Sequence, residues 1–245
     1  MLVSHDAGEQ WSELAVGVTA DLQSIAVAEG LPEGRETLWL AGYDGAVRHS
    51  TDGGVVWNEV SSPDVDWTAV ATDDVGRLAV LAGLDGSLWR SEAGGALSLA
   101  RAATTAGALH DVAVSHDGDT IVAVGEAGQI LVSHDAGTRF TAIAPVTDLD
   151  LYAVHLASNG ETIVAVGEAG LVLRIDDRGA HLQQTLEPDG ALFDLHLRAD
   201  GEGQAVGAAG AVLRTHDGGL HWRRVSTGRF ADLHGVDDFH AAPHL

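Results

Sequence analysis

The chain has 245 residues, 45% of them hydrophobic, so it is long enough to bury one sizeable core. It contains 36 acidic residues and 13 basic ones, giving a formal net charge of −23. This charge repels phosphate backbones, and no basic patch offsets it, so nucleic acid is not an expected partner. The chain has no cysteine, so neither disulfides nor thiolate-bound zinc hold the fold.

The repeating unit begins with an alternating segment and continues with a short apolar run. Alternation of apolar and polar residues predicts a half-buried strand, and a short continuous apolar run predicts a buried one. A Gly-x-x-Gly sequence then predicts a hairpin turn and leads into a third strand. The alternating segments are 22–28, 67–71, 109–115, 151–157, 192–198 and 230–236, and the clearest apolar runs are 37–41, 78–82 and 121–124.

Each unit ends in an octapeptide of the pattern Ser/Thr-x-Asp-x-Gly-x-x-Trp. Ser and Asp side chains hold a tight turn, Gly allows backbone conformations that other residues find costly, and Trp buries a large ring. The octapeptide therefore predicts a turn followed by a buried aromatic, with a structural role. The residues assigned to it are Ser4, Asp6, Gly8, Trp11, Ser50, Asp52, Gly54, Trp57, Ser133, Asp135, Gly137, Phe140, Asp177, Gly179, Thr215, Asp217, Gly219 and Trp222.

The octapeptides, including two degenerate ones, start at residues 4, 50, 91, 133, 175 and 215, so the unit is 40 to 46 residues long. Four antiparallel strands in a unit of this length predict an all-β, six-bladed β-propeller, with an open β-solenoid as the alternative. The predicted blades of this single domain are 21–62, 65–104, 108–146, 150–188, 190–228, and 229–245 together with 1–16. The last blade is thus expected to close the ring by joining the two chain ends. The rival account is a fragment of a longer, seven-bladed protein.

Residues 124–137, Val-Gly-Glu-Ala-Gly-Gln-Ile-Leu-Val-Ser-His-Asp-Ala-Gly, resemble the bacterial-neuraminidase-repeat, or Asp-box, β-propellers. The most similar branch is that of photosystem II assembly and stability factors, and the resemblance extends over nearly the whole chain. It implies a propeller fold shared by sialidases, other glycosidases and non-catalytic scaffolds. The assembly-factor branch also implies seven blades and export, whereas this sequence has six octapeptides and no signal peptide.

Sialidase chemistry, as the family implies it, needs an arginine triad, a tyrosine nucleophile with an acidic partner, and an acid/base carboxylate. The two tyrosines, Tyr43 and Tyr152, have no evident Glu partner in the sequence. The Arg-Ile-Pro signature is also missing, because Arg174-Ile175 is followed by Asp176. We therefore expect no enzymatic activity and no catalytic residues.

A set of polar residues in the first strands is expected to line the central channel. Such residues from adjacent blades could bind a cation, or they could simply form the polar lining of a wet channel. No tight metal-binding spacing supports the cation, so the lining is the favoured interpretation and no metal or other cofactor is expected. The residues are Asp111, His155, Asp194, His196, Asp232 and His234.

The favoured function is a non-catalytic scaffold that binds a protein partner of unknown identity. A glycan-binding or sialidase-like glycoside hydrolase propeller is the alternative, so a glycan is a further candidate ligand. No apolar run reaches the ~18 residues of a membrane-spanning helix, and no secretion signal opens the sequence. The expected location is therefore the cytoplasm, or outside it if a native N-terminal export signal has been removed.

Overall fold

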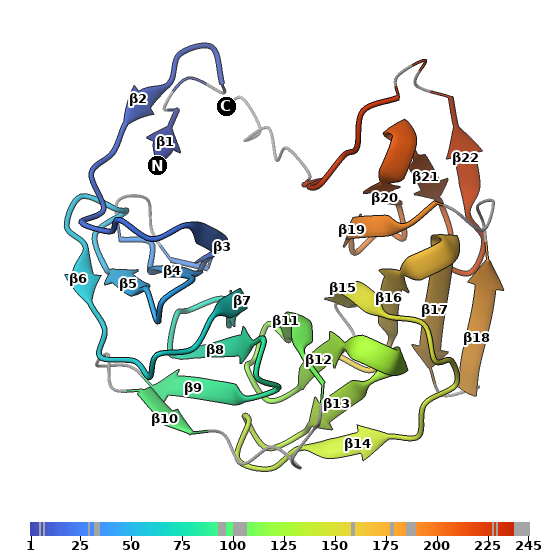
Figure 1. Cartoon of the computed structure of the whole chain (residues 1–245), viewed down its shortest axis with the longest axis horizontal. Coiled ribbons are helices and arrows are strands. Elements are labelled where there is room, and N and C mark those ends of the chain that lie inside the picture. Colours follow the sequence, from blue (N-terminus) through green and yellow to red (C-terminus); the bar gives the residue numbers. More distant parts are fainter. Residues whose placement is uncertain are drawn as a thin grey trace.

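A computed structural model describes residues 1–4, 6, 8–28, 30–31, 35–92, 97–99, 107–157, 160–176, 179–184, 190–226, 228 and 230–237. Within this part, five antiparallel sheets of four strands each follow one another around an arc, which begins with a two-stranded sheet (Figure 1). The all-β class and the four-stranded antiparallel units are confirmed, and the six sheets fit a six-bladed propeller.

The five complete blades each use four consecutive strands. Blade one contains β3 (Leu22–Val27), β4 (Leu38–Gly42), β5 (Val47–Ser50) and β6 (Asn58–Glu59), and blade two contains β7 (Trp67–Thr72), β8 (Leu78–Gly83), β9 (Leu88–Glu92) and β10 (Leu97–Leu99). Blade three contains β11 (Leu109–Val114), β12 (Ile121–Gly125), β13 (Ile130–Ser133) and β14 (Thr141–Ile143). Blade four contains β15 (Leu151–Leu156), β16 (Ile163–Gly167), β17 (Leu171–Asp176) and β18 (Gly179–Gln184). Blade five contains β19 (Leu192–Leu197), β20 (Gly203–Gly207), β21 (Val212–Thr215) and β22 (Arg223–Val225), and the N-terminal sheet pairs β1 (Leu2–Val3) with β2 (Ser12–Glu13).

The hydrophobic core is divided among the spaces between neighbouring blades. One cluster joins blades two and three, with Val80, Leu109, Leu131 and Phe140 among its members. Further clusters join blades one and two, three and four, and four and five. The second strands of blades two, three and four are apolar on both faces because each of these blades packs against a neighbour on either side. The continuous apolar runs of the sequence therefore lie in the middle of the blades.

The Gly-x-x-Gly turns between the second and third strands form three short 3₁₀ turns: η1 (Glu126–Gly128), η2 (Glu168–Gly170) and η3 (Ala208–Gly210). At the end of η1, Gly128 has φ +68° and lies against the Thr147 carbonyl, so a Cβ atom would clash there. Thr147 belongs to the segment that leads into blade four. The glycine is thus required both by the backbone conformation and by the close approach of the next blade.

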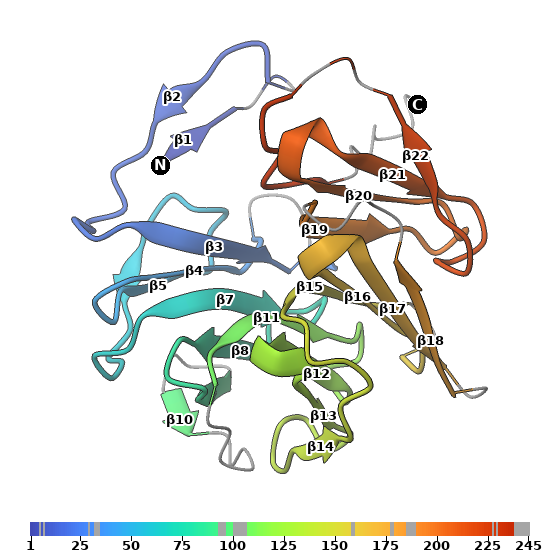
Figure 2. The same cartoon turned by 45° about the vertical axis from the view of Figure 1, so that its right-hand side comes forward.

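The first strand of every complete blade contains a β-bulge. The register shifts between Leu109 and Asp111 and between Leu151 and Ala153, and the same irregularity recurs in β3, β7 and β19. A bulge leaves one residue unpaired and turns its side chain away from the regular alternation. The first strands are also the strands nearest the middle of the arc (Figures 1 and 2). The bulges therefore lie on the channel side of each blade.

The expected closure of the ring is not seen among the described residues. The sheet of β1 and β2 has two strands only, and residues 230–237 form no strand. Residues 230–237 instead bond to blade five: the Leu233 N–H donates to the Gly207 carbonyl at 3.0 Å and the Val236 N–H to Asp194 Oδ2 at 2.7 Å. Residues 238–245, which were expected to supply the second strand of the sixth blade, lie outside the described residues.

Candidate functional site

The octapeptide turns with described side chains share one hydrogen-bond pattern. The hydroxyl of the first residue donates to the Asp Oδ1 at 2.8–2.9 Å and accepts the Gly N–H at 2.8–3.1 Å. The same Oδ1 accepts the N–H four residues further on, at 2.8–2.9 Å. The turns with this pattern are those of Ser4 and Asp6, Ser50 and Asp52, Ser133 and Asp135, and Thr215 and Asp217.

These hydrogen bonds change the acidity of the turn carboxylates. Backbone hydrogen bonds, followed by the Ser hydroxyl, lower the pKa values of Asp6, Asp52 and Asp135. Burial acts to raise the pKa of Asp217, but the hydrogen bonds from the His221 backbone, the His221 side chain and Thr215 lower it to about 2. The turn carboxylates are thus ionised groups held by their own turns. Asp177 lies outside the described residues, and Gly179 opens β18 with φ +110°.

The aromatic residues of the octapeptides differ in burial. Trp222 and Phe140 are buried, with exposed fractions of 8% and 7%, and each packs against the preceding blade. Trp57 is half-buried, whereas Trp11 is 62% exposed. The structure therefore agrees with a packing role for Trp222 and Phe140, and Trp11 lacks the neighbour that the other two have.

Four of the six polar channel candidates lie in two rows along the first strands. Asp111 and Asp194 share one row, immediately after the bulge. His155 and His196 share a second row, nearer the strand ends, with ring centroids 5.7 Å apart. His234 belongs to neither row, because its ring stacks on Phe193 at 5.0 Å. His234, which the sequence places among the same channel candidates, therefore lies apart from His155 and His196.

The aspartate row joins neighbouring strands. Asp111 Oδ2 accepts the Val154 N–H from blade four at 2.8 Å, while its Oδ1 accepts the N–H of Val112. Asp194 makes the equivalent pair of bonds, to Val236 and to Leu195. Burial raises the pKa of Asp111 to about 7, with a smaller contribution from the charge of Asp194, and burial also raises the pKa of Asp194. Asp232 is separate from this row, since its Oδ1 accepts the Ala209 N–H of η3.

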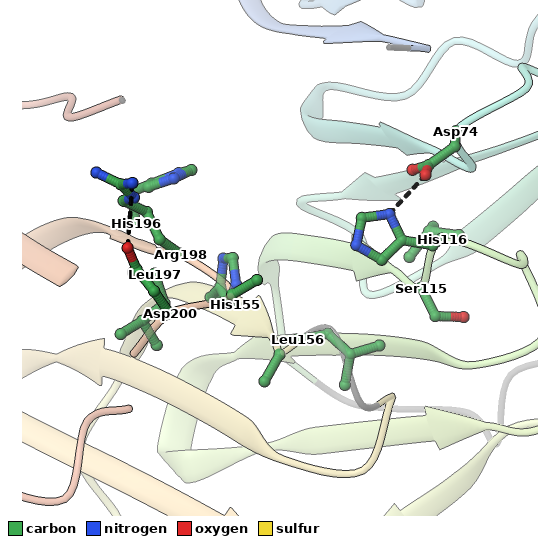
Figure 3. A pocket seen from close by; sticks show the side chains of 12 residues that line it. Asp74, Ser115, His116, His155, Leu156, His196, Leu197, Arg198 and Asp200 are labelled. Carbon is green, nitrogen blue, oxygen red and sulfur yellow. Dashed lines mark hydrogen bonds and ion pairs between the residues drawn. The ribbon is translucent and has the colours of Figure 1, made fainter. Parts of the chain in front are cut away.

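The histidine row borders a cavity of about 500 Å³ at one end of the channel (Figure 3). His155 and His196 line it together with His116, which is 2.6 Å from Asp74, and Arg198, whose guanidinium lies 3.1 Å from Asp200. Burial, and then the charges of His196 and His116, lower the pKa of His155 to about 4, so this ring is neutral at pH 7. Among the described residues, no group of three or more His, Asp or Glu side chains is arranged to hold a metal ion.

A row of aromatic rings, not expected from the sequence, lies at the bulges themselves. His110, Tyr152, Phe193 and His234 come from consecutive positions around the arc, and neighbouring ring centroids are 5.4, 6.1 and 5.0 Å apart. We call these four residues the aromatic arc. The first three are half-buried and His234 is exposed, so the rings are accessible from the channel. Aligning Leu109, Leu151, Leu192 and Leu233 would have revealed the row, since each arc residue follows one of these leucines.

The electrostatic surroundings of Tyr152 limit the chemistry of the arc. Burial, followed by the charges of Glu168 and Asp150, raises the pKa of Tyr152. A nucleophilic tyrosine requires activation, and these negative neighbours oppose formation of its phenolate.

No helix in the described part of the chain has the length and apolar character needed to cross a bilayer.

No family model matches the chain, and no curated protein matches it. Solved structures do. YCF48 bound to D1 peptide aligns with a TM-score of 0.66 and 19% identity over 89% of this chain and 71% of that one. YCF48 from Cyanidioschyzon merolae aligns with a TM-score of 0.68 and 17% identity over 91% of this chain and 77% of that one. The Niastella koreensis GH74 enzyme aligns with a TM-score of 0.67 and 17% identity over 83% of this chain, which spans 38% of the enzyme. At these identities the likeness is one of fold, and the chain is a β-propeller.

Proposed function

We propose that the chain is a non-catalytic Asp-box propeller, similar to photosystem II assembly factors, and that it binds a segment of a protein partner at the aromatic arc. The observation that carries the proposal is the arc itself. Tyr152 and Phe193 present half-exposed rings beside two histidines, and the four rings extend across two blade boundaries and onto the C-terminal segment. Aromatic residues are enriched at the centres of protein interfaces because they supply large contact areas at a low cost in conformational entropy.

The carboxylates of the channel support a binding role over catalysis. Asp111 and Asp194 each accept two backbone hydrogen bonds, one of them from the next segment around the arc, β15 or residues 230–237. Hydrogen bonds of this kind fix the carboxylates as part of the framework. The likeness to the YCF48 structures, one of which is bound to D1 peptide, is consistent with a propeller of this shape holding a peptide segment.

The proposal is tested by affinity capture with the parent protein and two variants at matched salt. Phe193→Ala removes the central ring of the arc, and Val55→Ala removes apolar surface from an octapeptide turn, where Val55 is 78% exposed. We expect the parent and Val55→Ala to retain the same protein, identified by mass spectrometry, and Phe193→Ala to lose it while keeping the parent's far-UV circular dichroism. Equal retention by all three, or no retained protein, would contradict the proposal.

A glycoside hydrolase is the second candidate, supported by the likeness to the GH74 enzyme and by the raised pKa values of Asp111 and Asp194. A carboxyl group that stays protonated near neutral pH can act as a general acid. The test is hydrolysis of aryl glycosides by the parent and by Asp111→Asn. Turnover that is abolished in Asp111→Asn would favour the enzyme, whereas the scaffold predicts no turnover by either protein.

A further inference from the structure

Two octapeptide turns are held on the preceding blade by the same arginine contact. Arg90 Nη1 in blade two donates to the Ala136 carbonyl in blade three at 2.6 Å. Arg174 Nε in blade four donates to the Gly218 carbonyl in blade five at 3.2 Å. Both arginines immediately precede the octapeptide of their own blade, and both acceptors are the fourth residue of the next octapeptide. The contact is therefore a repeated connection between blades.

The arginine is one part of the surface on which the next turn packs. We call this surface, formed by the arginine and its buried cross-strand partner, the seat of the turn. Val80 and Val164, the cross-strand partners of Arg90 and Arg174, are fully buried. A Cβ atom on Gly219 would lie 3.2 Å from Val164, so the glycine of the turn packs directly on that valine. Phe140 belongs to the same core cluster as Val80, and Trp222 to the same cluster as Val164. Each seat thus combines an arginine donor with a surface that covers the aromatic ring.

Blade five presents the arginine of such a seat, with Gln204 in place of the buried valine and no octapeptide on it. Arg214 pairs with Gln204 in the register that joins Arg174 to Val164. Here, however, Arg214 is exposed and Gln204 is only half-buried. Both residues line a cavity of about 200 Å³, which is also bordered by Glu202, by His216 and, from the C-terminal segment, by Val236 and Asp237. In the described part of the chain, no turn covers this face of β20 and β21.

The first octapeptide is a formed turn without a seat. Ser4 Oγ donates to Asp6 Oδ1 at 2.8 Å, and Trp11 Nε1 donates to the Gly8 carbonyl at 3.1 Å, as Trp222 Nε1 does to Gly219. Yet 62% of Trp11 is exposed, against 8% of Trp222. The turn already has the shape of the seated ones, and its aromatic ring lacks the surface that would cover it.

We propose that the β1–β2 hairpin docks on blade five of its own chain, with Trp11 covered by β20 and β21 next to Arg214. The hairpin and blade five are at the two ends of the arc (Figures 1 and 2), so docking closes the ring. Tethering within one chain gives the hairpin a high effective concentration, which favours it over the hairpin of a second copy. Closure also covers the sheet faces that are otherwise left open at the two ends of the arc.

A double-mutant cycle in the full chain tests this contact. Arg214→Ala and Trp11→Ala are compared singly and together, with Arg174→Ala and Trp222→Ala as the cycle for a turn that is already seated. If the hairpin docks, each single change lowers Tm by at least about 2 °C, and the double change lowers it by clearly less than the sum. Arg224→Ala, on the opposite face of blade five, is the control for loss of positive charge. Its change in Tm should add to that of Trp11→Ala.

Light scattering on the same samples gives the oligomeric state, and so distinguishes the hairpin of the same chain from the hairpin of a second copy. Coupling between Arg214 and Trp11 in a monomer supports docking within the chain. Additive or absent effects overturn the proposal, as expected if another segment of a longer protein fills the seat. Coupling that is found only in a dimer also overturns it, because the hairpin then comes from a second copy.

Discussion

Asp111 Oδ2 accepts the Val154 N–H at 2.8 Å, a hydrogen bond that joins the innermost strands of blades three and four. Asp194 repeats it with Val236, 2.7 Å away. In blade one the equivalent position is Ser24, whose hydroxyl accepts the Val70 N–H of blade two at 3.1 Å. A short polar side chain after the bulge thus connects neighbouring blades at the channel, where their apolar faces no longer meet. The channel carboxylates are part of the framework of the ring.

Asp111 should make the fold sensitive to pH near neutrality. Its pKa is raised by burial to about 7 in the folded protein, so the folded state holds its proton more tightly than the unfolded state, and the stabilisation is lost as pH rises from about 4 to 7. We expect the free energy of unfolding of Asp111→Asn, relative to the parent, to increase over this range in urea titrations. The variant is compared with the parent at each pH because His155 also titrates in this range. Its pKa is lowered to about 4, so its contribution to stability grows as pH rises, and this contribution cancels when the two proteins are compared.

The control for this titration is Glu13→Gln, which neutralises an exposed carboxylate on β2. Its stability relative to the parent should stay constant over the same pH range. A constant difference for Asp111→Asn as well would mean that the Asp111 carboxylate is not protonated in the fold, and the burial argument would fail.

Trp222→Ala should be strongly destabilising. The ring is 8% exposed and belongs to the core between blades four and five, so its removal leaves a cavity and costs about 3–5 kcal/mol. Phe230→Ala, at a side chain that is 87% exposed, should cost less than about 0.5 kcal/mol. Both values are measured by urea unfolding. Similar midpoints for the two variants would show that the octapeptide aromatic is not a packing residue.

Asp217→Ala should lose stability at neutral pH and lose less in acid. The carboxylate accepts hydrogen bonds from Thr215 and His221, and removing them costs about 1 kcal/mol. The pKa of Asp217 is lowered to about 2, so its contribution is present above about pH 4 and is lost as pH falls toward 2. The melting temperatures of the variant and parent should therefore converge in acid. A gap that stays constant from pH 6 to the acid limit of the fold would refute this.

Added salt should stabilise the fold, because the formal net charge is −23 and like charges repel across the surface. The effect should be largest below about 0.15 M, where the Debye length exceeds about 8 Å. Tm measured in sodium chloride and in potassium chloride should rise alike, which separates screening from ion-specific effects. A flat response to both salts would argue that the acidic residues are spaced too widely to repel one another.

The sequence predicted those parts of the fold that depend on local patterns. The octapeptide at Thr215 and the Gly-x-x-Gly turn at Gly125 identify their hairpins through residues that the turns themselves require, and the apolar run at 121–124 identifies a strand buried on both faces. The bulges were not predictable, because an inserted residue leaves the strand's composition unchanged. Without the bulges, His234 was grouped by residue type with His155 and His196, whereas its register places it beside Phe193.

The same limit explains why the aromatic arc was missed. Its members His110, Tyr152 and Phe193 are of different residue types, and each lies about 41 residues from the next, so residue type alone does not group them. The leucine that precedes each one is the only signal in the sequence that aligns them. Ring closure could not be settled from the sequence either, because it depends on contacts between chain ends rather than on a repeated local pattern.

The most direct test of the proposed function is the dissociation constant of the captured protein, measured by calorimetry with the parent, Phe193→Ala and Val55→Ala. If the arc forms the centre of the interface, Phe193→Ala weakens binding by at least about tenfold, since loss of a central aromatic residue typically costs more than about 1.4 kcal/mol. Val55→Ala should leave the constant unchanged. Equal dissociation constants for all three proteins would place the partner elsewhere and contradict a binding role for the channel.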